Sequence, residues 1–281
     1  MIDSCFLRFH FAFAVGAFLI GAASPCVASA AEAVDPLLNT EPASAWIVTV
    51  GGTVQVSPSF DGSRKLGPGG LPSISWRRAN EPADFNNPDD SFDFTLFETG
   101  EFRFGPVANY RDARLAGSDR RLTGIHKIPW TLELGGFAEY WPLQDKLRLR
   151  VELRRGFHGH TGLVGDLSAD WVERIGKFTL SAGPRLSLGD GRFMNTVFGI
   201  TAADALSNPS FKAYKPTGGI RAFGAGAAAS YAWSHVWTST LFARYERLVG
   251  QSAKSPIVSQ IGQRDQFTVG IGLTYSFRVK R

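Results

Sequence analysis

Hydrophobic and polar positions alternate along most of the chain after residue 45. The clearest stretch is 146–154, in which apolar residues alternate with charged ones: Leu147, Leu149, Val151 and Leu153 against Arg148, Arg150, Glu152 and Arg154. Segments 177–189 and 266–277 repeat the same period of two. Because successive side chains of a β-strand point to opposite faces, this pattern predicts strands with one apolar face and one polar face.

The alternation predicts twelve strands separated by turns and loops. They are expected at 45–57, 71–78, 91–98, 101–111, 131–141, 146–156, 162–173, 177–188, 193–199, 218–233, 236–248 and 266–277. Many of these segments have about 9 to 13 residues, whereas strands of soluble proteins centre on ~5–6 and a tilted strand that crosses a bilayer needs ~9–11. The lengths therefore favour a membrane β-barrel over a soluble β-sandwich.

The order of short and long connections bears on the number of strands. In a membrane barrel, short turns on the inner side alternate with long loops on the outer side. With 193–199 as a strand, the short turns at 175–176 and 234–235 fall on opposite sides. If 193–199 belongs to a loop, both turns fall on the same side of the membrane. The number of strands then becomes odd, and one segment before residue 100 must also be reassigned. We therefore expect an all-β, transmembrane, antiparallel up-and-down β-barrel of ten or twelve strands over 45–277, with twelve favoured.

The polar faces of the predicted strands carry many charged residues. Those expected to project into the lumen are Arg103, Glu133, Arg148, Arg150, Glu152, Arg154, Asp170, Arg185, Arg244 and Glu246. A charge that faces lipid is costly, so these side chains should face an enclosed interior. They could pair across strands and fill a narrow lumen, or they could line a pore that favours anions. We favour the filled lumen, because wide aqueous channels come with about 16–18 strands.

Aromatic residues gather at the ends of the predicted strands. The expected members of this aromatic girdle are Tyr140, Trp141, Trp171, Tyr231, Trp233, Trp237, Tyr275 and Phe277. Such residues concentrate at membrane–water interfaces because their rings are apolar and their polar tips stay in water. In this interpretation their partners are the lipids of the outer membrane.

The first 30 residues have the features of a cleavable signal peptide. The apolar run at 11–23 is shorter than the ~20 residues of a membrane-spanning helix, and Ala28-Ser29-Ala30 fits a cleavage site. Removal of 1–30 would leave 31–44 as an N-terminal periplasmic segment before the barrel. A basic C-terminal tail is expected at 278–281.

The composition suits a β-rich protein and excludes some classes of function. Among 281 residues Gly (31) and Phe (22) are abundant and Met (2) is scarce, which favours twisted strands and turns over packed helices. The net charge of +5 is mild and the basic residues are dispersed, so we expect no nucleic-acid binding. Both cysteines, Cys5 and Cys26, lie in the expected signal peptide, so the mature chain should lack disulfides.

We find no motif for catalysis, cofactor binding or a metal. His158-Gly159-His160 would place two imidazoles on one face of an extended segment, about 7 Å apart. A metal would need a third ligand, for which Asp166 is a candidate; a wet loop at a strand end is the favoured interpretation. Ser168 lies across a turn from these histidines and could act as the nucleophile of a lipid hydrolase, but no G-x-S-x-G motif supports this. We therefore expect no enzyme, cofactor or metal site.

Several blocks of sequence are similar to one known family. They are Phe104–Tyr110, Gly162–Leu167, Ser181–Pro184, Phe193–Thr201, Arg244–Gly250, Ser255–Val258 and Gln266–Phe277. Through these blocks, residues 45–277 resemble the MipA/OmpV family of outer-membrane proteins, the MltA-interacting protein family. The resemblance implies a porin-like barrel in the outer membrane of a Gram-negative bacterium. The family is named after a member described as a scaffold that links a murein transglycosylase to a penicillin-binding protein. The resemblance therefore implies a similar scaffold role for this chain and no catalytic residues.

Three functions are therefore compatible with the sequence. The favoured one is a structural or scaffold barrel of the cell envelope that links murein enzymes to the outer membrane. The alternative is a small, narrow pore or transporter for small solutes. A barrel enzyme that acts on lipid through Ser168 is the third.

Overall fold

The computed structural model describes residues 45–81, 83–115 and 118–279. The signal peptide expected at 1–30, the periplasmic segment expected at 31–44 and the last two residues of the expected tail lie outside the described residues. Arg278 and Val279, which were also expected in that tail, instead continue the final strand.

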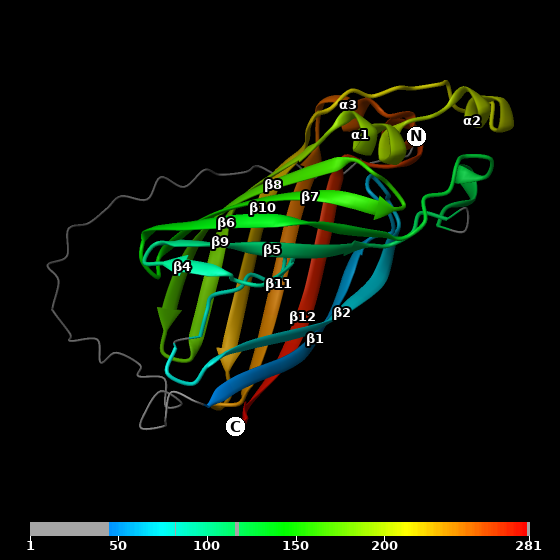
Figure 1. Ribbon diagram of the computed structural model, residues 1–281. Coiled ribbons are helices and arrows are strands. Elements are labelled where there is room, and N and C mark those ends of the chain that lie inside the picture. The colour runs from blue at the N-terminus through cyan, green and yellow to red at the C-terminus, as the bar shows by residue number, and fades with distance from the viewer. Residues whose placement is uncertain (1–44, 82, 116–117, 280–281) are drawn as a thin grey trace, which may run out of the picture. The chain divides into compact units, whose positions relative to one another are not determined.

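Twelve antiparallel strands form one sheet that curls into a barrel (Figure 1). The strands are β1 (Trp46–Pro58), β2 (Leu66–Arg78), β3 (Phe92–Asp93), β4 (Phe97–Thr99), β5 (Phe102–Arg111), β6 (Thr131–Leu143), β7 (Leu147–His158), β8 (Leu163–Ile175), β9 (Phe178–Gly189), β10 (Gly219–Ala232), β11 (Trp237–Leu248) and β12 (Asp265–Val279). Their order is β2-β1-β12-β11-β10-β9-β8-β7-β6-β5-β3, with β4 also beside β5. The predicted antiparallel barrel is thus confirmed.

The strand count reflects ten long strands and one interrupted strand. β3 and β4 both run along β5, and between them the Phe94 and Leu96 amides donate to the carbonyls of Pro106 and Phe104, each at 3.1 Å. The segment predicted at 91–98 therefore occupies one irregular strand position beside β5 instead of forming a full-length strand.

The strand predicted at 193–199 is wrong, because these residues form helix α1 (Gly191–Phe198). Phe193, Met194, Val197 and Phe198 are buried, and this spacing places them on one face of a helix rather than of a strand. The Asp190 side chain caps the helix by accepting from the Phe193 amide at 2.8 Å.

The pattern of burial along the strands is the reverse of that in a soluble protein. On β7, Leu149, Val151 and Leu153 are 40–57% exposed, whereas Arg148 and Arg150 are 1% and 5% exposed. The same outward display of large apolar side chains recurs on β1, β8, β11 and β12. An apolar exterior around a charged interior is stable only when hydrocarbon surrounds the barrel.

The connections differ strongly between the two ends of the barrel. At the end where β1 begins and β12 finishes, the turns are short, as at 144–146 and 176–177. At the other end, the connections contain α1, α2 (Ala202–Ser207), α3 (Gly250–Lys254), a 3-10 turn (Arg120–Leu122) and a π-helical turn (Ile257–Ile261) (Figure 1). Short inner turns and long outer loops define the inner and outer ends.

Apolar side chains form a small core that caps the outer end. One buried cluster joins α1 to strand ends and includes Phe193, Phe198 and Leu248. A second cluster lies beside it and includes Ile200 and Ile257. No helix among the described residues is long and apolar enough to cross a membrane.

Candidate functional site

A row of charged side chains from β7 forms the centre of the barrel interior. Arg148, Arg150, Glu152 and Arg154 occupy alternate positions of this strand, and all four are buried. Arg148 donates to Asp170 of β8 through Nη2 at 2.6 Å and through Nε at 3.1 Å. The strict alternation of β7 turns these residues inward, because the intervening apolar residues face outward.

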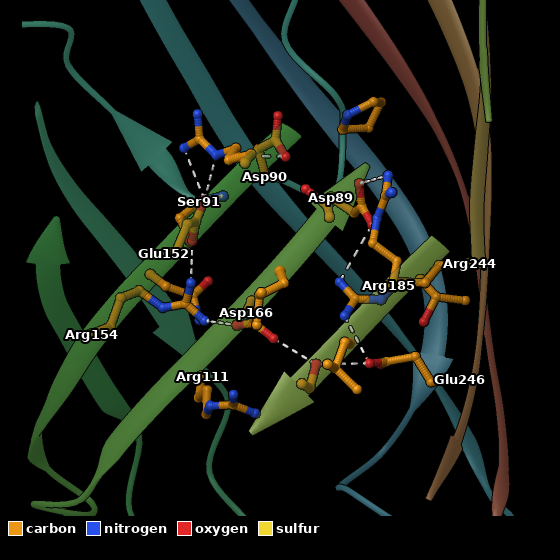
Figure 2. Close-up of a pocket in the computed structure, with 18 of the residues that line it drawn as sticks. Asp89, Asp90, Ser91, Arg111, Glu152, Arg154, Asp166, Arg185, Arg244 and Glu246 are labelled. Atoms are coloured by element: carbon orange, nitrogen blue, oxygen red, sulfur yellow. Dashed lines mark hydrogen bonds and ion pairs between the residues drawn. The ribbon is translucent and has the colours of Figure 1, made fainter. Parts of the chain in front are cut away.

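An inward-folded segment, residues 83–91 between β2 and β3, meets this row. Asp90 forms a bidentate pair with Arg148, with Nη1–Oδ2 at 2.6 Å and Nη2–Oδ1 at 3.0 Å. Asp89 forms a second bidentate pair with Arg185 of β9, at 2.8 and 3.1 Å (Figure 2). Paired geometry of this kind gives the strongest charge-assisted hydrogen bonds.

Two neutral side chains of the same segment complete its attachment to the wall. The Asn87 amide donates to Asp170 at 3.0 Å, and the Ser91 hydroxyl donates to Glu152 at 2.6 Å. The segment is therefore bonded to β7, β8 and β9 inside the barrel. We call residues 87–91 the internal segment.

A second cluster of charges lies nearer the outer end, around Glu133 of β6. This carboxylate is fully buried and accepts from Arg111 of β5 at 2.5 Å, from Arg154 at 3.1 Å and from the His160 ring at 3.0 Å. Several hydrogen bonds to one buried carboxylate offset the cost of removing it from water.

A third cluster lies on β9–β11. Glu246 accepts from Arg244 at 2.8 Å and from the Ser187 hydroxyl at 3.2 Å. Arg221 reaches Asp61, in the β1–β2 turn, at 3.1 Å. Gly226 of β10 lies beside the Arg185 side chain, where an added Cβ would lie 3.0 Å from the guanidinium, so the small residue makes room for the arginine.

Two cavities remain between these clusters and the outer cap. The inner one has a volume of about 290 Å³ and lies on the outer side of the internal segment, against Asp89, Arg185 and Arg244 (Figure 2). The outer one has a volume of about 330 Å³ and lies beside the β1–β2 turn. Asp61 and Arg111 line both.

The outer cap is held by a buried carboxylate of α2. Asp204 accepts from the backbone and the ring of His126, each at 2.8 Å, and forms a capping box with Thr201. Burial alone would raise the pKa of the Asp204 carboxyl, but the hydrogen bonds from His126 and Thr201 bring that pKa down to about 2. The carboxylate thus ties the 112–130 loop to the 190–218 loop.

The predicted lumen charges lie on the inner face of the barrel wall. The buried ones are Glu133, Arg148, Arg150, Glu152, Arg154, Asp170 and Arg185. Arg244 and Glu246 border the inner cavity with side chains 21% and 16% exposed. Arg103 lies near the inner end and pairs with Asp84 and Glu98, both at 2.8 Å.

The sequence did not predict the residues in connections that form ion pairs with the lumen charges. Asp61, Asp89 and Asp90 belong to connections, and a Pro- and Asp-rich stretch such as 86–91 reads as an ordinary loop. Nothing in its composition indicates that it folds inward. Arg221 was missed because a register shift between Ile220 and Ala222 interrupts the alternation of β10.

The girdle prediction is wrong for Trp141. Its side chain is 7% exposed, its Nε1 donates to Glu139 at 2.7 Å and its ring packs edge-on against Phe85. Tyr140 precedes it and stacks on Phe102 of β5. Two adjacent residues of one strand cannot both face lipid.

The other predicted girdle residues lie at the inner ends of their strands. Trp171, Trp233, Trp237, Tyr275 and Phe277 are exposed. Tyr231 is partly buried and packs between Phe178 and Trp233, with ring centroids 4.7 Å away on each side.

The two histidines considered for a metal do not share a face. His158 has a φ of 79°, is exposed and packs against Trp130, whereas His160 is buried on Glu133. The left-handed residue breaks the extended geometry that would have aligned them. Ser168 pairs with Arg150 in the β7–β8 ladder, well below the outer-end histidines. Among the described residues no group of three potential ligands is placed to hold a metal ion.

Strands long enough to cross a bilayer, wrapped with apolar side chains outward and charges inward, define a membrane β-barrel of the antiparallel type found in the outer membrane of Gram-negative bacteria. The protein is therefore an outer-membrane β-barrel protein, as predicted. Residues 50–277 match the family described as MltA-interacting protein MipA, and the chain belongs to this family.

Solved structures with a similar arrangement are distant. An outer membrane channel from Pseudomonas putida F1 has 10% identity and a TM-score of 0.44, with 85% of this chain and 98% of that chain covered. The outer membrane protein OprG from Pseudomonas aeruginosa has 12% identity, a TM-score of 0.31 and coverages of 84% and 96%. The NanC porin has 10% identity and a TM-score of 0.37, with 82% of this chain and 98% of that chain covered. Likenesses this distant carry no functional inference. Comparison with curated protein sequences gave no match.

Proposed function

We propose that the protein is a structural, non-catalytic barrel that anchors murein enzymes at the inner face of the outer membrane. The observation that carries this proposal is the internal segment, which is bonded across the interior through Asp89 and Asp90. A lumen filled in this way is poorly suited to bulk transport. The surface left for function is then the outside of the barrel and its turns.

The family description supports a partner of defined class. It names an interaction with MltA, which we take to be a murein transglycosylase; a penicillin-binding protein is the second partner implied by the resemblance. Such enzymes act on the periplasmic side. We therefore assign their contact to the inner turns, including 144–146, 176–177 and 233–236.

A pull-down with a matched pair of variants tests this assignment. The mature barrel in detergent is immobilised and presented with a purified murein transglycosylase and a bifunctional penicillin-binding protein. Lys177→Glu reverses an exposed charge on an inner turn, and Lys212→Glu makes the same change on an outer loop. Retention should fall for Lys177→Glu and stay unchanged for Lys212→Glu. Retention no greater than on an unrelated outer-membrane barrel would refute the proposal.

A narrow pore is the second candidate. The observation that favours it is the pair of cavities that share Asp61 and Arg111 and so border one another from the outer turn to the interior. Single-channel recording in planar bilayers separates the two functions. A scaffold barrel should give little conductance, whereas stable, ion-selective steps would favour the pore.

A further inference from the structure

The barrel wall has a seam between β2 and β5. β2 pairs with β1 along its whole length, and among the described residues it has no strand paired on its other side. β5 is covered by β3 only as far as Ala108. The edge of β2 contains Pro68 and Pro72, which lack the N–H that a further strand would need and are confined to edge strands.

The seam is closed by side chains at its inner half and hollow at its outer half. Near the inner end, the rings of Trp76 and Phe94 approach to 5.6 Å across the seam. Higher up, Leu71 of β2 and Asn109 of β5 both line the inner cavity. An unpaired edge is excluded from hydrocarbon unless it borders a cavity. Asn109 lies two residues from the outer end of β5, at Arg111, so the hollow part of the seam lies toward the outer leaflet.

The inward-facing side chains of β2 are more exposed to solvent than those of β7. Leu71, Ser73 and Ser75 lie on the inward-facing positions of β2, yet all three are exposed. The inward residues of β7 from Arg148 to Arg154 are buried. Leu71, one of these exposed residues, also lines the inner cavity.

The inner cavity offers donors that lack acceptors. Among the described residues, the buried Nε atoms of Arg221 and Arg244 have no hydrogen-bond partner, and the Arg221 side chain is only 5% exposed. Both arginines line the same cavity as Leu71. The neighbouring carboxylate of Glu246 accepts from Arg244, from Ser187 and, at 3.4 Å, from Nη2 of Arg221. A buried donor without an acceptor is costly, and an anion in this cavity would supply one.

We propose that the β2–β5 seam is a lateral entrance from the outer leaflet, through which the anionic head group of a single-chain amphiphile reaches Arg221 and Arg244. The cavity of about 290 Å³ is at the small end of ligand sites, which span ~300–1,000 Å³. It accommodates a phosphate or carboxylate head group, while the chain stays in the seam against Leu71 and the surrounding hydrocarbon. This site is independent of the proposed scaffold contacts, which lie at the opposite end.

Binding of three probes to the mature barrel distinguishes the possible sources of the anion. The probes are dodecyl phosphate, inorganic phosphate and dodecanol, titrated against protein in dodecyl maltoside and measured by native mass spectrometry. Dodecyl phosphate should bind more tightly than either of the others by about tenfold or more, since it alone joins the charge-assisted hydrogen bonds to the apolar contact. Equal binding of inorganic phosphate would overturn the lateral route in favour of free anions, and equal binding of dodecanol would overturn the arginine site.

Variants locate the entrance and the head-group site. Leu71→Trp fills the seam from the inward face, whereas Ile74→Trp adds the same ring on the outward face of the same strand. Leu71→Trp should weaken dodecyl phosphate binding by about tenfold and Ile74→Trp should not; Ser73→Trp serves as a second block if Leu71→Trp loses the heat-modifiable folded band. Arg244→Gln should weaken binding, and Arg244→Lys should restore part of it. Unchanged binding in either seam variant that folds would refute the entrance.

Discussion

Replacing Arg148 by methionine removes the guanidinium that joins the barrel wall to the internal segment. Arg148 is 1% exposed and forms two hydrogen bonds to Asp90 and two to Asp170, at 2.6–3.1 Å. Methionine keeps the length of the side chain but leaves these carboxylates, together with Glu139 at 3.4 Å from Nη1, without their shared cation. The substitution therefore tests how far water is excluded from the ion pairs in the interior.

The size of the effect depends on the effective dielectric constant around the pair. For unit charges ~4 Å apart, the attraction is about 4 kcal/mol at an effective dielectric constant of 20 and about 1 kcal/mol in bulk water. Removing one partner of a buried pair costs about 3–5 kcal/mol, because the remaining charge is uncompensated. An exposed pair contributes about 0–1 kcal/mol. We expect Arg148→Met to lower the free energy of unfolding by about 3–5 kcal/mol, since the group is enclosed by the internal segment.

Urea unfolding of the mature barrel in lipid vesicles, followed by tryptophan fluorescence and by heat-modifiability on gels, measures this loss. The matched control is Arg155→Met on the outward face of the same strand, which should change the free energy of unfolding by no more than about 0.5 kcal/mol. Adding Asp90→Asn to Arg148→Met should restore part of the loss, because the carboxylate that paired bidentately with Arg148 is removed with it, whereas Asp170 keeps its pair with Arg185 at 2.7 Å. A loss below about 1 kcal/mol for Arg148→Met would refute the reasoning, because it would mean that water screens the pair.

Three further outcomes are expected. Asp89→Ala combined with Asp90→Ala removes both bidentate pairs of the internal segment, which is then held only through Asn87 and Ser91, and should raise single-channel conductance above that of the wild type. An unchanged conductance would mean that the segment does not block the lumen. Because the folded pKa of Asp204 is about 2 and the ordinary value is ~3.9, its carboxylate stabilises the outer cap above about pH 4, and this contribution is lost as the pH falls toward 2. Proteolysis of the cap should rise over that window in the wild type, whereas Asp204→Asn should be sensitive at neutral pH already; the same acid profile in both would contradict this role. In single-tryptophan variants, brominated lipids should quench Trp237 and leave Trp141 unquenched, and equal quenching would place Trp141 outside the barrel.

Secondary structure could be predicted from the sequence where one period dominates. On β7 every second residue is apolar, and the observed Leu147–His158 strand agrees with the predicted 146–156. The prediction failed at 193–199, where Phe193, Met194, Val197 and Phe198 also fit a helical face. Short apolar runs are ambiguous between the two periods, and packing against the outer-end strands decides in favour of the helix.

The charged positions on the strands could be predicted, but their partners could not. Alternation alone turns Arg148 and Arg185 inward, because their neighbours on the strand must face hydrocarbon. Asp89 and Asp90 reach them from a connection more than 50 residues earlier in the chain. A loop has no periodicity that encodes its direction, so only the closed wall and its excess of guanidinium groups determine that this loop folds inward.

The sequence by itself determined which side of each strand meets lipid and which meets the interior, because that choice is made residue by residue through hydrophobicity. Only the tertiary structure decided that charged side chains fill much of the interior, that the outer end is capped and that β2 and β5 meet at a seam without pairing. These features arise from contacts between segments far apart in the chain, and their geometry depends on how the sheet closes rather than on any local pattern.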